Sequence, residues 1–160
     1  MWHLFPSMIN SESRFTQIEI FAGDGNIDEL KKILQIGYTQ SEINTALDNA
    51  IAYSQIQTAE YLLSLGANFS YYGYNGVYYA AHNNELEGLK FAIANGVDIN
   101  VENGMILNTS IVTATNTKSI ELIKWLLDNG AKLDLLTIQS IEIISEYGTD
   151  ELKSLIENAT

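Results

Sequence analysis

Few residues of this 160-residue chain are of the types that perform catalysis or bind a metal. There is no cysteine, and the two histidines, His3 and His82, lie far apart in the sequence. A zinc site built from cysteine and histidine is therefore not expected. A general base needs an orienting partner and a nucleophile, and the sequence around His82 supplies neither. His82 is interpreted instead as a solvent-exposed or contact residue.

The segment DGNIDE, residues 24–29, has the oxygen-bearing side chains of a calcium-binding loop. Such a loop needs a glycine at its sixth position and a glutamate at its twelfth. Here the glycine comes second, and Gln35 stands at the twelfth position. A turn between two helices explains the segment better. Phosphate-binding and nucleophile-elbow motifs are also missing from the sequence, so we expect no catalysis, no cofactor and no metal.

Tyrosine is concentrated in one short stretch. The segment NFSYYGYNGVYYAAH, residues 68–82, holds five of the nine tyrosines: Tyr71, Tyr72, Tyr74, Tyr78 and Tyr79. These rings could fill the core, stack on nucleic-acid bases or contact a protein. Base stacking needs a basic groove beside the rings, and residues 54–89 contain neither lysine nor arginine. We therefore expect no nucleic-acid partner.

Acidic residues outnumber basic ones by 20 to 8, which gives a formal net charge of −12. Such a charge repels phosphate backbones and anionic lipids, and no apolar run approaches the ~18 residues of a membrane helix. We expect no membrane partner. The acidity would attract a protein with a basic surface, or it serves only solubility. The lack of cysteine and of a signal peptide favours a cytoplasmic location.

An apolar segment with helical spacing recurs along the chain. Four copies end at a glycine and a fifth at an alanine, with spacings of 29, 30, 34 and 29 residues: Gly37, Gly66, Gly96, Gly130 and Ala159. Glycine at a helix end adopts the left-handed conformation without strain. The spacing therefore predicts five helices of similar length, with Leu126 on the buried face of the fourth.

A shorter apolar segment precedes each of these helices. Three of the shorter segments begin at a threonine that we expect to be a helix N-cap: Thr16, Thr45 and Thr109. The repeated unit is therefore a short first helix, a turn and a longer second helix. Such a pair cannot bury its apolar faces alone, whereas a stack of pairs can.

The units resemble ankyrin repeats. The third unit, YNGVYYAAHNNELEGLKFAIANGVDIN, has the paired alanines Ala80 and Ala81, the acid Glu87 of the second helix and a terminal G-V-D-I-N. The resemblance covers about residues 14–160 and is weaker for the first helix, where T-P-L-H never appears intact. It implies an all-α, ankyrin-like helical-repeat solenoid with short or absent β-hairpin fingers. Another α-solenoid of helical hairpins is the alternative architecture.

The resemblance also implies one domain over residues 1–160. Residues 1–13 would form an N-terminal cap segment, and the repeats would span approximately 14–37, 40–66, 70–96, 104–130 and 133–160. Only the stretch between Gly96 and Thr109 is long enough for a full hairpin finger.

In ankyrin repeats the loop tips and the exposed side of the first helix face the partner. By this register the loop tips carry Tyr71, Tyr72, Tyr74, Met105 and Ile106. The first helices contribute Tyr53, His82, Asn83, Asn116 and Thr117. Tyr78 and Tyr79 are predicted to be mainly structural. The alternative is that the loops fold back and bury their rings against the next repeat.

These features predict a non-catalytic protein–protein interaction module that binds through its concave face. A small inhibitor or neutralising partner, such as a toxin-immunity protein or a viral antagonist, fits the acidity and the compact array. Two alternatives are a scaffold or adaptor, and an acidic nucleic-acid mimic whose carboxylates block a basic groove.

Overall fold

The computed structural model describes residues 11–159, with side chains described from Arg14 onward. Of the predicted cap segment, residues 1–13, residues 1–10 lie outside the described residues and residues 11–13 belong to the first turn of α1. Within this range there is no β-strand, and no helix has the length and apolar character to cross a membrane. The elements are α1 (Ser11–Gly23), α2 (Ile27–Leu34), α3 (Gln40–Ala52), α4 (Ile56–Ser64), α5 (Asn75–His82), α6 (Leu86–Ala94), α7 (Val101–Thr117), α8 (Glu121–Asp128), the 3-10 helix η1 (Leu133–Leu135), α9 (Ile138–Tyr147) and α10 (Asp150–Asn158).

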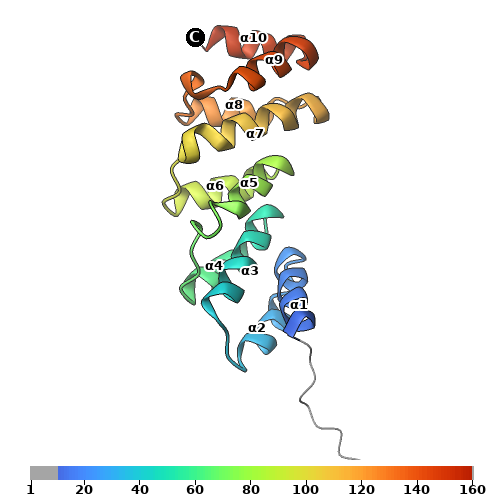
Figure 1. Cartoon of the computed structure of the whole chain (residues 1–160), viewed down its shortest axis with the longest axis vertical. Coiled ribbons are helices and arrows are strands. Elements are labelled where there is room, and N and C mark those ends of the chain that lie inside the picture. The colour runs from blue at the N-terminus through green and yellow to red at the C-terminus, as the bar shows by residue number, and fades with distance from the viewer. Residues whose placement is uncertain (1–10, 160) are drawn as a thin grey trace, which may run out of the picture.

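The helices pair in chain order, and the pairs follow one another along the long axis of the molecule (Figure 1). The first helices of the pairs, α1, α3, α5, α7 and α9, pack against one another in that order. Each second helix packs against the first helix of its own pair. The chain is therefore the all-α helical-repeat solenoid that the sequence predicts.

One hydrophobic core runs through the stack. Small side chains let the first helices approach closely, and Ala22, Ala50 and Ala80 are completely buried. Leu126 of α8 is also completely buried, as predicted from the apolar face of its helix. Because each pair buries its apolar face against its neighbours, the stability of one pair depends on the next.

Four second helices end at glycines in the predicted left-handed conformation. The φ angles are 121°, 92°, 101° and 101° at Gly37, Gly66, Gly96 and Gly130. A Cβ atom at any of these positions would meet no atom within 4 Å. The backbone conformation, and not a lack of space, is therefore what favours glycine at these helix ends.

The predicted starts of the first helices are wrong. Thr16, Thr45 and Thr109 lie inside α1, α3 and α7. The N-cap of α3 is Thr39, whose hydroxyl accepts a hydrogen bond from the Glu42 N–H, while the Glu42 carboxylate accepts one from the Thr39 N–H. This reciprocal pair is a capping box, and the sequence T-Q-S-E is its signature. Helix α3 therefore begins well before Thr45.

The long segment after Gly96 does not form the predicted hairpin finger. Helix α7 begins at Val101, is interrupted by positive φ angles over residues 102–104, and continues to Thr117. Ile106 and Leu107 are buried in the core, where their apolar side chains are removed from water. Because these residues belong to the early part of α7, their side chains reach the core. In an exposed finger they would remain in contact with water.

In place of finger ladders, side-chain amides bond the loops to neighbouring units. Asn108 of α7 donates from Nδ2 to the carbonyl oxygens of Gly104 and Leu135, both at 2.9 Å. Its Oδ1 accepts from the Thr137 N–H at 2.9 Å and from the Ser140 hydroxyl at 2.7 Å. Related bonds to loop backbone are made by Asn44 and Asn100. These bonds satisfy backbone groups that the missing fingers would otherwise pair.

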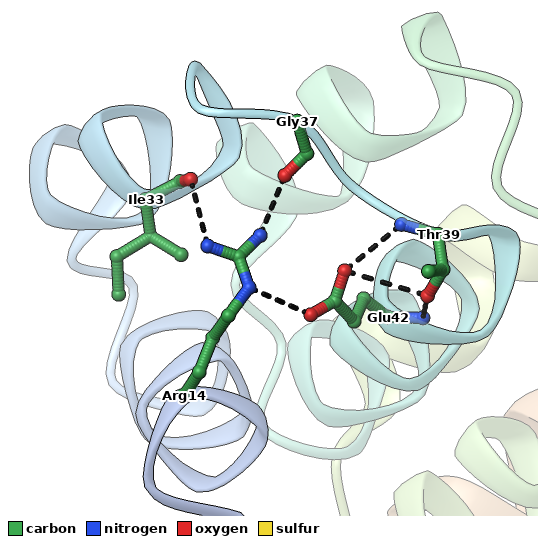
Figure 2. Close-up of polar contacts among 5 residues, drawn as sticks. All are labelled: Arg14, Ile33, Gly37, Thr39 and Glu42. Atoms are coloured by element: carbon green, nitrogen blue, oxygen red, sulfur yellow. Dashed lines mark hydrogen bonds and ion pairs between the residues drawn. The ribbon is translucent and has the colours of Figure 1, made fainter. Parts of the chain in front are cut away.

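A charged contact joins the first pair to the second (Figure 2). The single arginine of the chain, Arg14, donates from Nε to Oε1 of Glu42 at 2.8 Å. Its other two nitrogens donate to the carbonyl oxygens of Ile33 at 3.2 Å and Gly37 at 2.5 Å, beside the C-terminal end of α2. Burial alone would raise the pKa of Glu42, but the bonds from Arg14 and Thr39 and the charge of Arg14 lower it. Arg14 thus links α1, α2 and α3.

Candidate functional site

The first helices of the first three pairs enclose a groove of about 440 Å³. We call it the tyrosine groove, and its lining residues are Glu19, Asp48, Asn49, Ala52, Tyr53, Asn75, Tyr79, His82 and Asn83. A second depression of about 290 Å³ adjoins it and shares Glu19, Asn49 and Tyr53. The two hollows form one continuous face over α1, α3 and α5.

Aromatic side chains are exposed on this face, next to small residues of the neighbouring helices. Tyr53 is 52% exposed, and a Cβ atom added to Gly23 would lie 3.2 Å from its ring, so Gly23 gives the ring room. Tyr79 is 44% exposed, and its ring centroid lies 5.1 Å from that of Tyr78 and 6.3 Å from that of His82. The exposed ring of Tyr79 therefore has two aromatic neighbours, Tyr78 and His82.

The prediction that Tyr78 and Tyr79 are mainly structural is wrong. Val77, Ala80 and Ala81 fill the core side of α5, which turns the two tyrosines outward. Tyr78 lines a further groove of about 380 Å³ between α5, α7 and α9, and His82 lines both grooves. The position of His82 fits its interpretation as an exposed residue.

The three loop tyrosines do not line either groove. Tyr72 is exposed, and its ring centroid lies 4.1 Å from that of Tyr71. The Tyr71 hydroxyl donates to the Ser41 hydroxyl oxygen at 3.0 Å, which ties this ring to α3. Tyr74 is half-buried against the core and is the N-cap of α5. Tyr71 and Tyr72 thus form a separate small surface.

The predicted contact residues of the fourth unit are not brought together. Ile106 is completely buried and Met105 packs against the core, so the predicted exposed tip at these two residues is wrong. Both belong to the early turns of α7, which replaces the expected finger. Asn116 and Thr117 are exposed at the opposite end of α7 and do not line the tyrosine groove. Only Tyr53, His82 and Asn83 of the predicted set meet in that groove.

The sequence-based prediction missed Asp48, which lines the groove from α3. The residue is only 6% exposed, and its Oδ1 accepts a hydrogen bond from the Gly76 N–H at 3.1 Å. A Cβ atom at Gly76 would lie 2.5 Å from the Asp48 Cα, so only glycine permits this approach of α5 to α3. The sequence signal that could have identified Asp48 is an acidic residue within the mainly apolar segment TALDNAIA, residues 45–52.

Burial raises the pKa of Asp48 to about 7, because the ionised carboxyl is removed from water. The hydrogen bond from the Gly76 N–H acts in the opposite direction but is the smaller effect. The groove therefore holds a carboxyl group that changes charge near neutral pH.

The chain is similar to a protein of Acanthamoeba polyphaga mimivirus whose name describes it as an ankyrin repeat protein. The two are 27% identical over 122 residues, which make up 76% of this chain. The chain spans about a quarter (25%) of the length of that relative. No family model matches the chain.

The match agrees with the helical-repeat solenoid. Within the described residues, no group of three or more histidine, cysteine, aspartate or glutamate side chains is placed to hold a metal ion. The groove therefore has groups that can contact a partner rather than groups arranged for catalysis. Exposed rings, side-chain amides and the carboxyl of Asp48 all line it.

Proposed function

We propose that this chain binds another protein through the face formed by α1, α3 and α5, with the tyrosine groove at the centre of the contact. The observation that carries the proposal is the placement of Tyr53 and Tyr79, from adjacent units, around one groove with their rings about half exposed. Tyrosine gives a large contact area with few rotatable bonds and a hydroxyl that can bond a partner.

The similarity to an ankyrin repeat protein supports the same reading, since the resemblance implies that the exposed side of the first helices faces the partner. Tyrosine is one of the residue types enriched at the cores of protein interfaces. Tyr71 and Tyr72 would lie towards the rim of the contact, on the loop that leads into α5.

The finer proposal is that the partner is an enzyme or toxin that this chain inhibits. The net charge of −12 supports a basic partner, because opposite charge speeds association. An adaptor would instead bind two partners at once without blocking activity. A nucleic-acid mimic would depend on its carboxylates more than on its rings.

The test begins with a partner identified by crosslinking and mass spectrometry and then purified. The Tyr53→Ala, Tyr79→Ala double variant should weaken binding at least about 30-fold, because aromatic anchors carry about 2 kcal/mol when they are hot spots. The matched control is Tyr38→Ala, Tyr147→Ala, which removes two exposed rings that do not line the groove. The measurement is isothermal titration calorimetry, with circular dichroism to show that both variants stay folded.

Normal binding by the folded double variant would place the contact elsewhere. Moderate salt distinguishes binding through the rings from nucleic-acid mimicry. Binding through the rings should persist, whereas a nucleic-acid mimic should release its partner. Assaying the activity of the partner alone and in the complex distinguishes inhibition from bridging.

A further inference from the structure

The tyrosine groove contains a carboxylate with unused bonding capacity. Among residues 14–159, the Gly76 N–H is the only hydrogen-bond donor to the Asp48 carboxyl. No completely buried side-chain oxygen or nitrogen in this range lacks a partner, so the second oxygen of Asp48 must be reached by solvent. A carboxylate can accept about four hydrogen bonds. Part of that capacity is therefore unused, at a residue that lines the groove.

The surroundings of Asp48 favour a cation. Glu19 of α1 adds a second carboxyl to the lining, and Tyr53 and Tyr79 add two rings, whose faces attract positive charge. No lysine or arginine lines the groove, and the single arginine of the chain is engaged in the contact between α1, α2 and α3. Within the described residues, no lysine or arginine is therefore placed to neutralise the Asp48 carboxylate.

We infer that the tyrosine groove receives an arginine side chain of the partner protein, whose guanidinium bonds the Asp48 carboxylate and stacks on Tyr53 or Tyr79. This inference rests on the proposed protein-binding function. Arginine fits better than lysine, because its flat guanidinium can bond a carboxylate with two parallel N–H groups and also lie against a ring. The groove volume, about 440 Å³, lies within the range of ligand pockets.

Binding of arginine should also depend on pH. Burial raises the pKa of Asp48 to about 7, and a guanidinium beside it would lower that pKa again. Affinity should therefore rise with pH until the carboxyl is ionised, and level off above about pH 7. The other titratable groups near Asp48 are Glu19 on α1, Tyr53 just after α3, Tyr79 and His82 on α5, and Tyr71 in the loop before α5. A His82→Asn variant should keep this pH dependence.

The experiment uses small probes with the full chain at pH 8. N-acetylarginine amide, its lysine counterpart and the neutral isostere N-acetylcitrulline amide are titrated into 15N-labelled protein, and the Gly76 amide signal is followed by NMR. The arginine probe should bind at least about tenfold more tightly than the citrulline probe, and more tightly than the lysine probe. Asp48→Asn keeps an oxygen for the Gly76 N–H and should remove the preference. Glu60→Gln, the same charge change on the exposed side of α4, should retain it.

Equal binding of arginine and citrulline by the wild-type chain would overturn the inference, and this comparison does not depend on any variant folding. Loss of the preference in Glu60→Gln as well as in Asp48→Asn would assign it to overall charge and would also overturn the inference. If the probes fail while the Tyr53→Ala, Tyr79→Ala variant loses the purified partner, the proposed function stands without the arginine. Normal partner binding by that double variant would contradict both the proposed function and the inference about arginine.

Discussion

Asn108 and Asp48 both extend from a first helix to the backbone of the next unit, but they are satisfied to different degrees. Asn108 uses both its donors and accepts two further bonds, so its amide is fully engaged in joining α7 to the chain around α9. Asp48 receives one bond, from the Gly76 N–H, and holds a buried carboxyl beside an open groove. The comparison suggests that the first residue contributes stability and that the second gives up stability for binding.

The largest effect on stability is expected for Asn108→Ala. The change removes four hydrogen bonds, three of them part-buried and the one from the Thr137 N–H exposed, and each bond contributes about 0.5–1.5 kcal/mol. The free energy of unfolding should fall by about 3–5 kcal/mol. Urea denaturation measures it. Asn95→Ala, which removes an exposed amide bonded only within its own helical pair, is the control and should change little. A loss below about 1 kcal/mol would show that the joint does not depend on the amide.

Arg14→Met should have the next largest effect, because Arg14 is charged yet fully engaged. Losing three bonds at a half-buried site should cost about 2–3 kcal/mol. The pKa of Glu42 is lowered in the folded chain, so its contribution is present above its ordinary pKa of 4.5 and is lost as pH falls through the folded value. The gap between wild type and variant should therefore narrow in acid.

The control for Arg14 is Lys32→Met, which breaks the exposed ion pair with Glu29. That pair is solvent-exposed, so its loss should change the free energy of unfolding much less than the loss of Arg14 does. Chemical denaturation from pH 3 to pH 8 compares the two variants. Equal losses at pH 7 would mean that the contacts of Arg14 with the end of α2 add nothing beyond an ordinary surface pair.

Asp48→Asn should have the smallest effect of the three and the opposite sign. The pKa of Asp48 is raised in the folded chain, so folding favours the protonated carboxyl, and the wild type loses stability as pH rises from about 4 to about 7. The variant lacks this loss and should be more stable than wild type by about 1–3 kcal/mol at pH 8, with no difference near pH 4. Thermal melting across this pH range tests it. A variant less stable at pH 8 would make Asp48 a structural residue like Asn108.

The sequence predicts the second helices well because their signals are local. A glycine that must take a positive φ and an apolar stripe at helical spacing are both properties of a short segment, as at Gly66 and Gly130. The starts of the first helices are predicted less well, because a threonine such as Thr45 can be an N-cap but can also lie inside a helix. The capping box formed by Thr39 and Glu42 marks the true start of α3.

The candidate site was only partly predictable, because its key features depend on how neighbouring helices approach. Tyr79 points outward because Ala80 and Ala81 fill the core side of α5. Asp48 becomes buried only because Gly76 brings the backbone of α5 against it. Neither relation exists within one segment of the sequence, so residue type and spacing alone could not identify the groove.

The replacement of hairpin fingers by single side chains has a mechanical consequence. A ladder of backbone bonds shares a load among many groups, whereas joints such as those at Arg14 and Asn108 rest on a few atoms each. Tension applied along the long axis would therefore concentrate at these joints. The molecule should extend in discrete steps, one helical pair at a time, and the force needed at each step would depend on the side chain at that joint as well as on the apolar packing between the pairs.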